Sequence, residues 1–151
     1  MAAYSFTDVT ASITGPGGNF SLKGDNAEEG ITIEPTGDVN TMTQGADGGV
    51  MHSLSAQTSG TVTVKLLKTS PLNAQLMTML NYQRASSARH GQNTITVRDA
   101  ARGDNITCTA CAFKKVPSLT YAKEGGTLDW TFDAGAITNV VGSGTPTAPA
   151  V

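Results

Sequence analysis

The pattern of apolar and polar positions changes its period once along this chain, within residues 60–82. Over residues 60–66 the two kinds of side chain alternate, which is typical of an antiparallel strand with one face in a core. The apolar face holds Val62, Val64 and Leu66. The opposite face holds Thr61, Thr63 and Lys65, which we expect outside the core.

A helix is predicted directly after this strand. Ser70 is a favourable N-cap, and Pro71 suits the first helical position because proline has no N–H to lose there. The apolar residues that follow recur at helical spacing and form one stripe: Leu72, Leu76, Met79 and Leu80. No other segment predicts a helix as clearly.

The rest of the chain predicts short strands separated by turns. The expected strands are residues 4–13, 20–22, 31–34, 93–98, 106–115, 118–123, 127–133 and 136–141, with 118–123 and 127–133 forming a hairpin around Glu-Gly-Gly. The predicted fold is therefore mainly β, an antiparallel sandwich or barrel-forming pair of sheets with one flanking α-helix. We expect one domain over residues 1–142 and a flexible tail over 143–151.

Residues 36–59 are rich in Gly, Thr, Asp and Gln, with isolated apolar residues. Two interpretations are open: a mobile surface loop, or a projecting hairpin built around Gly-Ala-Asp-Gly-Gly and ordered by a partner. The alternation around the turn favours the hairpin. A projecting hairpin with isolated apolar side chains suits a protein that docks against copies of itself.

Composition narrows the possible functions. The 151 residues carry a formal net charge of -2 and a pI near 5.5, so a dedicated nucleic-acid binder is disfavoured. The first residues show no secretory signal pattern, and no apolar run approaches the length of a membrane span. We therefore expect a soluble product of the cytoplasm.

Candidates for catalysis or metal binding are few. Cys108 and Cys111 have C-x-x-C spacing, but in a regular strand residues three apart point to opposite faces, so we interpret them as buried strand residues. His52 and His90 lie in polar, loop-like segments that do not orient a general base. Trp130 shares a strand face with apolar neighbours, which favours a core role over sugar stacking. We predict no enzyme activity, no metal and no cofactor.

Three stretches of this sequence, residues 27–34, 40–77 and 112–137, resemble the tail tube proteins of contractile-tailed bacteriophages. The resemblance runs over most of residues 3–142 and rests on length and order, since no single piece is a catalytic-type motif. It implies a sandwich flanked by a helix, six copies in a ring, and rings stacked into the inner tube of a virion tail. It further implies assembly in the host cytoplasm, a sheath around the tube, and baseplate and terminator proteins at its ends.

The resemblance also suggests roles for individual residues. The segment 36–59 would contact the next ring, with Met42, Met51 and Leu54 as apolar anchors and Asp47 in the turn. The polar face that holds Thr61, Thr63 and Lys65 would line the lumen or a neighbouring subunit.

The net charge of each copy predicts an acidic tube through which double-stranded DNA slides without specific binding. Two alternatives stay open. One is a baseplate or tail-terminator protein of the same fold, and the other is a surface-binding β-sandwich module.

Overall fold

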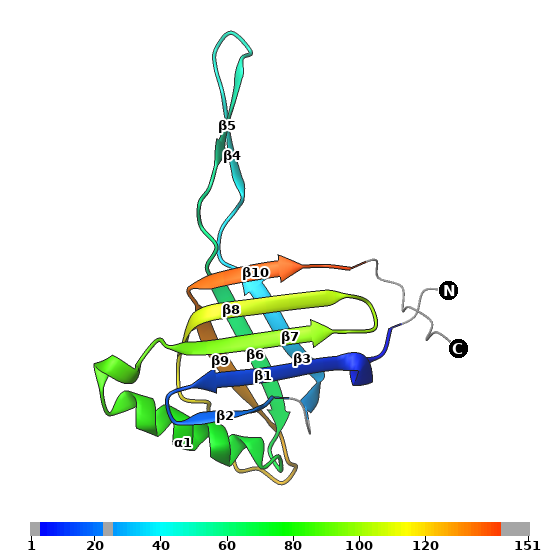
Figure 1. The fold of residues 1–151 in the computed structure, drawn as a ribbon, viewed down its shortest axis with the longest axis vertical. Coiled ribbons are helices and arrows are strands. Elements are labelled where there is room, and N and C mark those ends of the chain that lie inside the picture. Colours follow the sequence, from blue (N-terminus) through cyan, green and yellow to red (C-terminus); the bar gives the residue numbers. More distant parts are fainter. Residues whose placement is uncertain (1–3, 23–25, 143–151) are drawn as a thin grey trace.

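A computed structural model describes residues 4–22 and 26–142 of this chain, which hold two β-sheets, a projecting hairpin and one α-helix (Figure 1). The first sheet contains β1 (Val9–Gly15), β2 (Gly18–Ser21), β7 (Asn93–Asp99), β8 (Asp104–Phe113) and β10 (Ala136–Val140). The second contains β3 (Asn26–Pro35), β6 (Gly60–Leu67) and β9 (Thr127–Ala134). The hairpin is β4 (Asn40–Gln44) and β5 (Val50–Leu54), and the helix is α1 (Leu72–Arg84). Short 3-10 turns cover Phe6–Asp8 and Ser87–Arg89.

Strand β8 belongs to both sheets and joins them. Its first part pairs with β7 and β10, and its last residues, Ala112 and Phe113, pair with β9. The change of sheet occurs next to Ala110, whose φ of 52° interrupts the regular strand. In Figure 1 the strands of the second sheet cross behind those of the first, as in sandwiches whose sheets pack across one another. All pairings are antiparallel, so the predicted fold class is confirmed.

The core lies between the two sheets. Val62, Val64 and Leu66 are fully buried there, as their alternation predicts. Trp130 is also fully buried, and its indole N–H donates to Asn73 Oδ1 at 3.0 Å, so its predicted core role is confirmed. Its ring meets that of Phe113 edge to face, with 6.1 Å between centroids.

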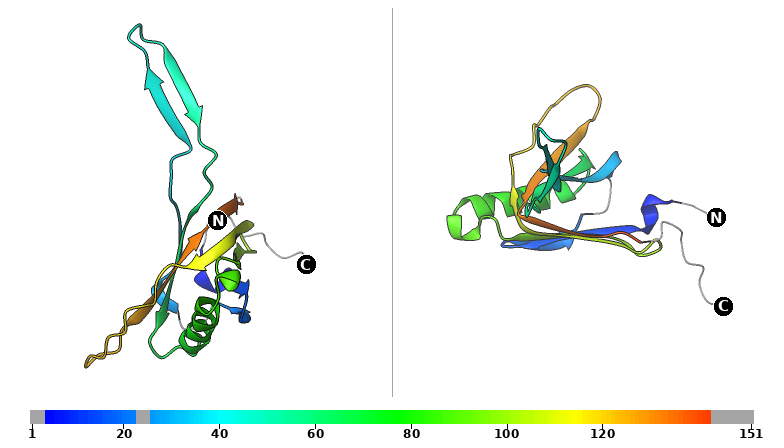
Figure 2. Two further views of the ribbon diagram at one scale, coloured as in Figure 1. Left: turned by 90° about the vertical axis from the view of Figure 1, so that its left-hand side faces the viewer. Right: turned by 90° about the horizontal axis from the view of Figure 1, so that it is seen from above.

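Helix α1 closes one side of this core. Pro71 already has helical dihedrals, and Ser70 Oγ accepts a hydrogen bond from the N–H of Leu72 at 3.3 Å, which satisfies one N-terminal donor as predicted. In the predicted stripe, Leu76, Met79 and Leu80 are buried and Leu72 is partly buried. In the left view of Figure 2 the helix lies beside the sheets, away from the hairpin.

Three expectations from sequence are wrong in detail. The predicted strand 4–13 begins only at Val9, because residues 6–8 form a 3-10 turn. The predicted strand 118–123 is irregular chain, because the ladder from β8 ends where the N–H of Lys114 donates to Thr131 O and Pro117 follows. The two cysteines do not point to opposite faces, because the irregular residue Ala110 lies between them and both thiols enter the core. The predicted tail, 143–151, lies outside the described residues.

Candidate assembly surfaces

The hairpin β4–β5 projects from the body and forms the longest extension of the molecule (Figures 1 and 2). Every residue of both strands is exposed, so the hairpin packs against no other element of the described part of the chain. The structure therefore shows the hairpin alternative for residues 36–59. An isolated two-stranded hairpin is marginally stable in water, and exposed apolar side chains on one indicate an interface.

The register of the hairpin separates the predicted anchors onto two faces. Asn40 lies opposite Leu54, Met42 opposite His52, and Gln44 opposite Val50, so these six side chains share one face. Met42 and Leu54 are thus brought together, and Met51 lies on the other face among threonine and serine side chains. Sequence reasoning missed Val50 as a third apolar member of the first face. Val50 is 53% exposed, and it lies on this face because the length of the turn places it opposite Gln44.

The turn of the hairpin uses Asp47 for its own geometry. The Asp47 Oδ1 atom accepts a hydrogen bond from the N–H of Gly49 at 3.0 Å, and Gly48 has a φ of 87°, which favours glycine. Asp47 therefore lies at the tip, apart from the apolar anchors. At the body end of the hairpin strands, Asn40 Nδ2 and His52 Nδ1 are 3.0 Å apart, a cross-strand contact that gives the histidine a structural partner.

The outer face of the second sheet carries the predicted residues Thr61, Thr63 and Lys65, all half-buried. They lie directly opposite Asp133, Thr131 and Asp129 of β9. On the other side, Glu34 of β3 lies opposite Thr61. Among the described side chains of this face, three carboxylates therefore accompany one lysine, which gives a polar surface with an acidic balance.

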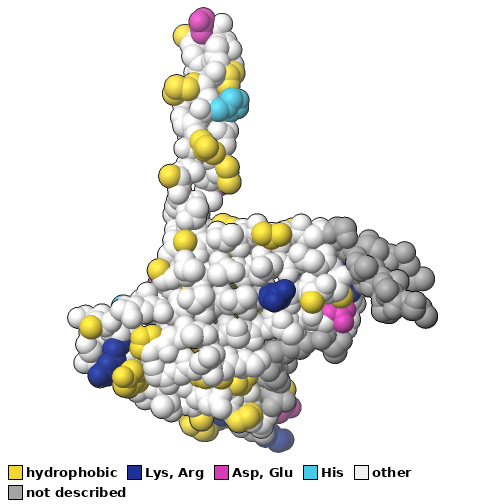
Figure 3. Space-filling view, viewed as in Figure 1, with side chains coloured by type: hydrophobic (Ala, Val, Ile, Leu, Met, Phe, Trp, Pro, Cys, Tyr) yellow, Lys and Arg dark blue, Asp and Glu magenta, His cyan; other side chains and the backbone are white. Residues whose placement is uncertain are grey.

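The outer face of the first sheet is different, because hydroxyl groups cover it. Alternating residues of β1, β2, β7, β8 and β10 meet in rows, one of which is Ser21, Ser12, Thr96, Thr107 and Thr138. Figure 3 shows this face as a largely uncharged surface. Among the described side chains of these outward rows the charged one is Arg98. Sequence reasoning did not single out this face, although the repeated Thr-x-Ser-x-Thr alternation of β1 carries the signal.

Three strands lie at sheet edges in the described part of the chain: β2, β3 and β10. Strand β3 is the longest of them and pairs on one side with β6. Strand β10 pairs with β8 on one side, and on its other side the N–H of Ile137 donates to Thr58 O at 2.8 Å. Edge strands present backbone donors and acceptors that pair readily with another chain.

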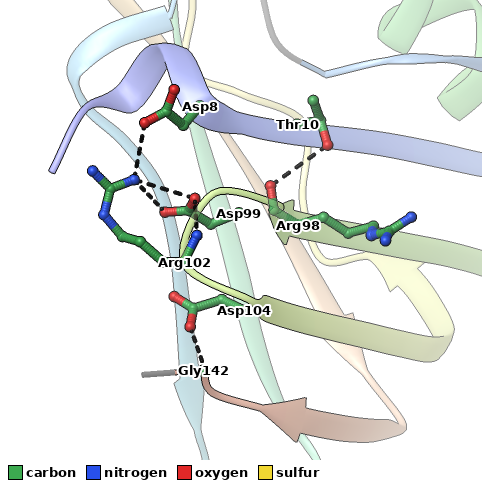
Figure 4. Close-up of polar contacts among 7 residues, drawn as sticks. All are labelled: Asp8, Thr10, Arg98, Asp99, Arg102, Asp104 and Gly142. Carbon is green, nitrogen blue, oxygen red and sulfur yellow. Dashed lines mark hydrogen bonds and ion pairs between the residues drawn. The ribbon is translucent and has the colours of Figure 1, made fainter. Parts of the chain in front are cut away.

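Both ends of the described chain are held at one side of the first sheet, around a buried arginine (Figure 4). Arg102 Nη1 lies 3.0 Å from a carboxylate oxygen of Asp8 and 3.0 Å from one of Asp99. At the other end of the same turn, Asp104 Oδ1 accepts the N–H of Gly142 at 2.9 Å. The turn between β7 and β8 therefore fixes the segments that lead to both termini.

The residues considered for chemistry are dispersed. Cys108 and Cys111 are free thiols without exposed surface, and burial raises the pKa of both, that of Cys111 to about 12. His52 and His90 are exposed and lie on separate segments. Within residues 4–22 and 26–142 no three His, Cys, Asp or Glu side chains form a group that could hold a metal ion. Nor does the same part of the chain contain a helix long and apolar enough to span a membrane.

Comparisons with known proteins agree with an assembly role. The family model described as bacteriophage PhiTE tail tube protein matches residues 1–142. No curated protein sequence matches the chain.

Among solved structures, the PVC sheath/tube terminator of an extracellular contractile injection system has a TM-score of 0.60 at 12% identity, with 93% of this chain and 99% of that chain covered. The PVC sheath-tube complex of such a system gives 0.55 at 9% identity, with 92% of each chain covered. The tube-terminating cap of the anti-feeding prophage gives 0.51 at 11% identity, with 87% of each covered. At these identities the likeness shows a shared fold.

Proposed function

Because this chain belongs to the family of bacteriophage PhiTE tail tube proteins, we propose that it is the subunit of the inner tube of a contractile phage tail. In this proposal six copies close into a ring, and rings stack into a tube that conducts double-stranded DNA during ejection. The subunit assembles in the host cytoplasm and becomes part of the virion tail. Its role is structural, with a sheath around the tube and baseplate and terminator proteins at its ends.

The observation that carries this proposal is the combination of strands at sheet edges with an exposed hairpin. The edges of β3 and β10 offer backbone groups to a neighbour in the same ring, and closing a ring pairs such edges. The hairpin projects away from the body and offers apolar side chains to a copy outside that ring. A lateral contact and a longitudinal contact are together what a stacked tube requires.

The outer face of the second sheet is the proposed lumen or neighbour-facing surface, with Thr61, Thr63 and Lys65 at its centre. Its acidic balance favours the lumen, because phosphates are repelled by carboxylates and bound by clustered cations. The three strands of this sheet from each of six copies, about 4.8 Å apart and tilted by roughly 40°, give a circumference of about 110 Å. A bore of that size passes duplex DNA.

Residues 36–59 are the proposed inter-ring contact, and the exposed anchors Met42, Met51 and Leu54 support it. Asp47 contributes by shaping the tip through its bond to the N–H of Gly49. The anchors alternate with polar side chains, so the hairpin stays soluble in the free subunit and has apolar groups to bury when it docks.

Electron microscopy of the purified chain tests the proposal directly. We expect rings and tubes of constant width, with length growing with protein concentration. Monomers at every concentration, in a protein with native circular dichroism, would contradict the proposal. A structure of the tube with its bore dominated by Lys and Arg would contradict the assignment of the lumen while leaving the tube intact.

A tail or tube terminator of the same fold is the second candidate, because a terminator is among the similar solved structures. A terminator forms one ring and stops, whereas a tube subunit continues to add rings. The length distribution in the same micrographs separates them: single rings favour the terminator, and long tubes favour the tube subunit.

A further inference from the structure

A groove lies between the C-terminal half of α1 and the chain that leaves β8. Leu80, Phe113 and Val116 supply its apolar walls, and Arg84, Lys114 and Lys115 supply its charges, with His90 at its rim. Among the described residues that line the groove, three are cations and none is a carboxylate. Leu80 and Phe113 are buried at its floor, while Val116 is 41% exposed. The groove therefore fits a segment that is apolar and negatively charged.

The hairpin of this chain has that composition. Residues 36–59 contain Asp38 and Asp47 and no Lys or Arg. One face presents Met42, Val50 and Leu54, which are 60%, 53% and 83% exposed. Apolar side chains and opposite charge thus occur on two surfaces of the same molecule, and no described residue covers either surface.

The two surfaces lie toward opposite ends of the molecule. In Figure 1 the hairpin forms the upper end, and α1 with the chain that follows β8, coloured yellow to gold, lies in the lower part of the body. Figure 2 shows the same separation from the side. Surfaces that complement each other from opposite ends form a head-to-tail contact, which repeats along an axis without closing.

The hairpin is long enough for this contact. About eleven residues on each arm, at about 3.3 Å per residue, reach roughly 36 Å from the body, against roughly 26 Å for a strand the length of β6. A hairpin from one copy therefore reaches past the near end of the next body and lies along its side. That is where the groove is found.

We propose that the groove between α1 and residues 113–116 is the receptor for the hairpin of the next copy along the tube. The face with Met42, Val50 and Leu54 packs against Leu80, Phe113 and Val116. The acidic hairpin, with Asp38 at its base and Asp47 at its tip, brings negative charge toward the three groove cations. This inference rests on the proposed function, because it names the surface that receives the inter-ring hairpin. It assigns Lys114 and Lys115 a role in selecting the register between rings.

A charge swap tests the pairing. The groove variant carries Lys114→Glu and Lys115→Glu, both at exposed positions. The hairpin variant carries Asp38→Lys and Asp47→Asn, and asparagine keeps a side-chain oxygen for the turn. We expect each variant alone to raise the concentration needed for tube growth at least tenfold, because like charges then meet. The combined variant, in which every interface again has opposite charges, is expected to recover growth.

Lys123→Glu is the matched control, because it reverses a charge in the same connecting segment but outside the groove lining. It should leave tube growth unchanged, and circular dichroism should show that all four variants fold. The inference is overturned if the groove variant grows tubes as the unmodified chain does, or if the combined variant fails to recover. Absence of tubes from the unmodified chain would instead overturn the proposed function.

Discussion

Gln83 on α1 and Asn93 at the start of β7 exchange two buried hydrogen bonds. Gln83 Nε2 donates to Asn93 Oδ1 at 2.7 Å, and Asn93 Nδ2 donates to Gln83 Oε1 at 3.0 Å. The same Gln83 nitrogen also donates to Pro16 O at 2.9 Å. The pair therefore joins the helix to β7 and to the turn between β1 and β2, with both amides satisfied inside the core.

We expect Asn93→Ala to destabilise the subunit by about 1–3 kcal/mol, because it leaves the buried Gln83 amide short of partners. The free energy of unfolding from urea titration measures this loss. Gln92→Ala is the matched control at the neighbouring exposed position and should change stability by less than about 0.5 kcal/mol. Equal losses of unfolding free energy in the two variants would show that the buried amide pair does not stabilise the fold.

Arg102 forms one ion pair with the buried Asp99 and another with the more exposed Asp8, and two substitutions compare their contributions to stability. Arg102→Met should cost about 3–5 kcal/mol, because it leaves the buried Asp99 carboxylate without its cation. Asp8→Asn should cost less than about 1 kcal/mol, since Asp8 is 38% exposed and Arg102 keeps Asp99. Thermal unfolding of both variants gives the comparison. A larger loss for Asp8→Asn would contradict the assignment of Asp99 as the main partner.

Ala110→Gly is expected to stabilise the protein. Ala110 has a φ of 52° and an exposed side chain, so the left-handed conformation costs about 1–2 kcal/mol that glycine avoids. Glycine loses about 0.5–1 kcal/mol through its greater freedom in the unfolded chain, which leaves a net gain of about 0–1.5 kcal/mol. Ala112→Gly in the same strand, where φ is negative, should destabilise instead. A loss at both positions would mean that Ala110 is unstrained.

The buried thiols predict a loss of stability at high pH. Burial, with a smaller contribution from Cys108, raises the pKa of Cys111 to about 12 from an ordinary value of 9.0. Between those values the unfolded chain releases this proton and the folded chain keeps it. The thiol therefore stabilises the fold below about pH 9, and that contribution falls by up to about 1.4 kcal/mol per pH unit as the pH rises toward 12.

Urea titrations between pH 8 and pH 11 measure this loss. The double variant Cys108→Ala/Cys111→Ala is the control, because it lacks both buried thiols. We expect its stability to fall less steeply than that of the unmodified chain. Parallel curves would mean that the thiols ionise freely in the folded protein.

Deleting residues 40–54 should leave a folded subunit that does not stack. The N–H of Ser55 donates to Val39 O at 2.8 Å, so the two ends of the deletion already lie side by side and join without strain on the body. We expect native circular dichroism, rings at most, and no tubes. Tubes of normal length from this variant would show that the hairpin is not the inter-ring contact.

The elements that sequence predicts correctly are those with local signals. The alternation of β6, the cap at Ser70 and the apolar stripe of α1 all depend on neighbours within a few residues. The turn of β8 from one sheet to the other was missed, because a left-handed alanine has no signature in sequence. The groove was missed for a different reason: Leu80 and Val116 are distant in the chain, and only the fold brings them to one surface.

The predicted strand over residues 118–123 failed because alternation alone does not provide a partner. Apolar residues recur there, but Leu119 and Tyr121 are 52% and 83% exposed. Tyr121 instead stacks on the Lys68 ammonium, 3.8 Å from the ring centroid. A strand needs backbone hydrogen bonds to a neighbouring strand as well as alternating side chains. The connecting segment does not form them, because it diverges from β9 after Lys114.

In the proposed tube, the hairpin gives each filament a direction. If all hairpins point the same way along the filament, one end of the filament carries projecting hairpins and the other end carries empty grooves. The two termini then differ chemically, so a capping protein that fits one has nothing to recognise on the other. Growth rates at the two termini would differ for the same reason, and a filament could be sealed at its start while it continues to lengthen at its far end.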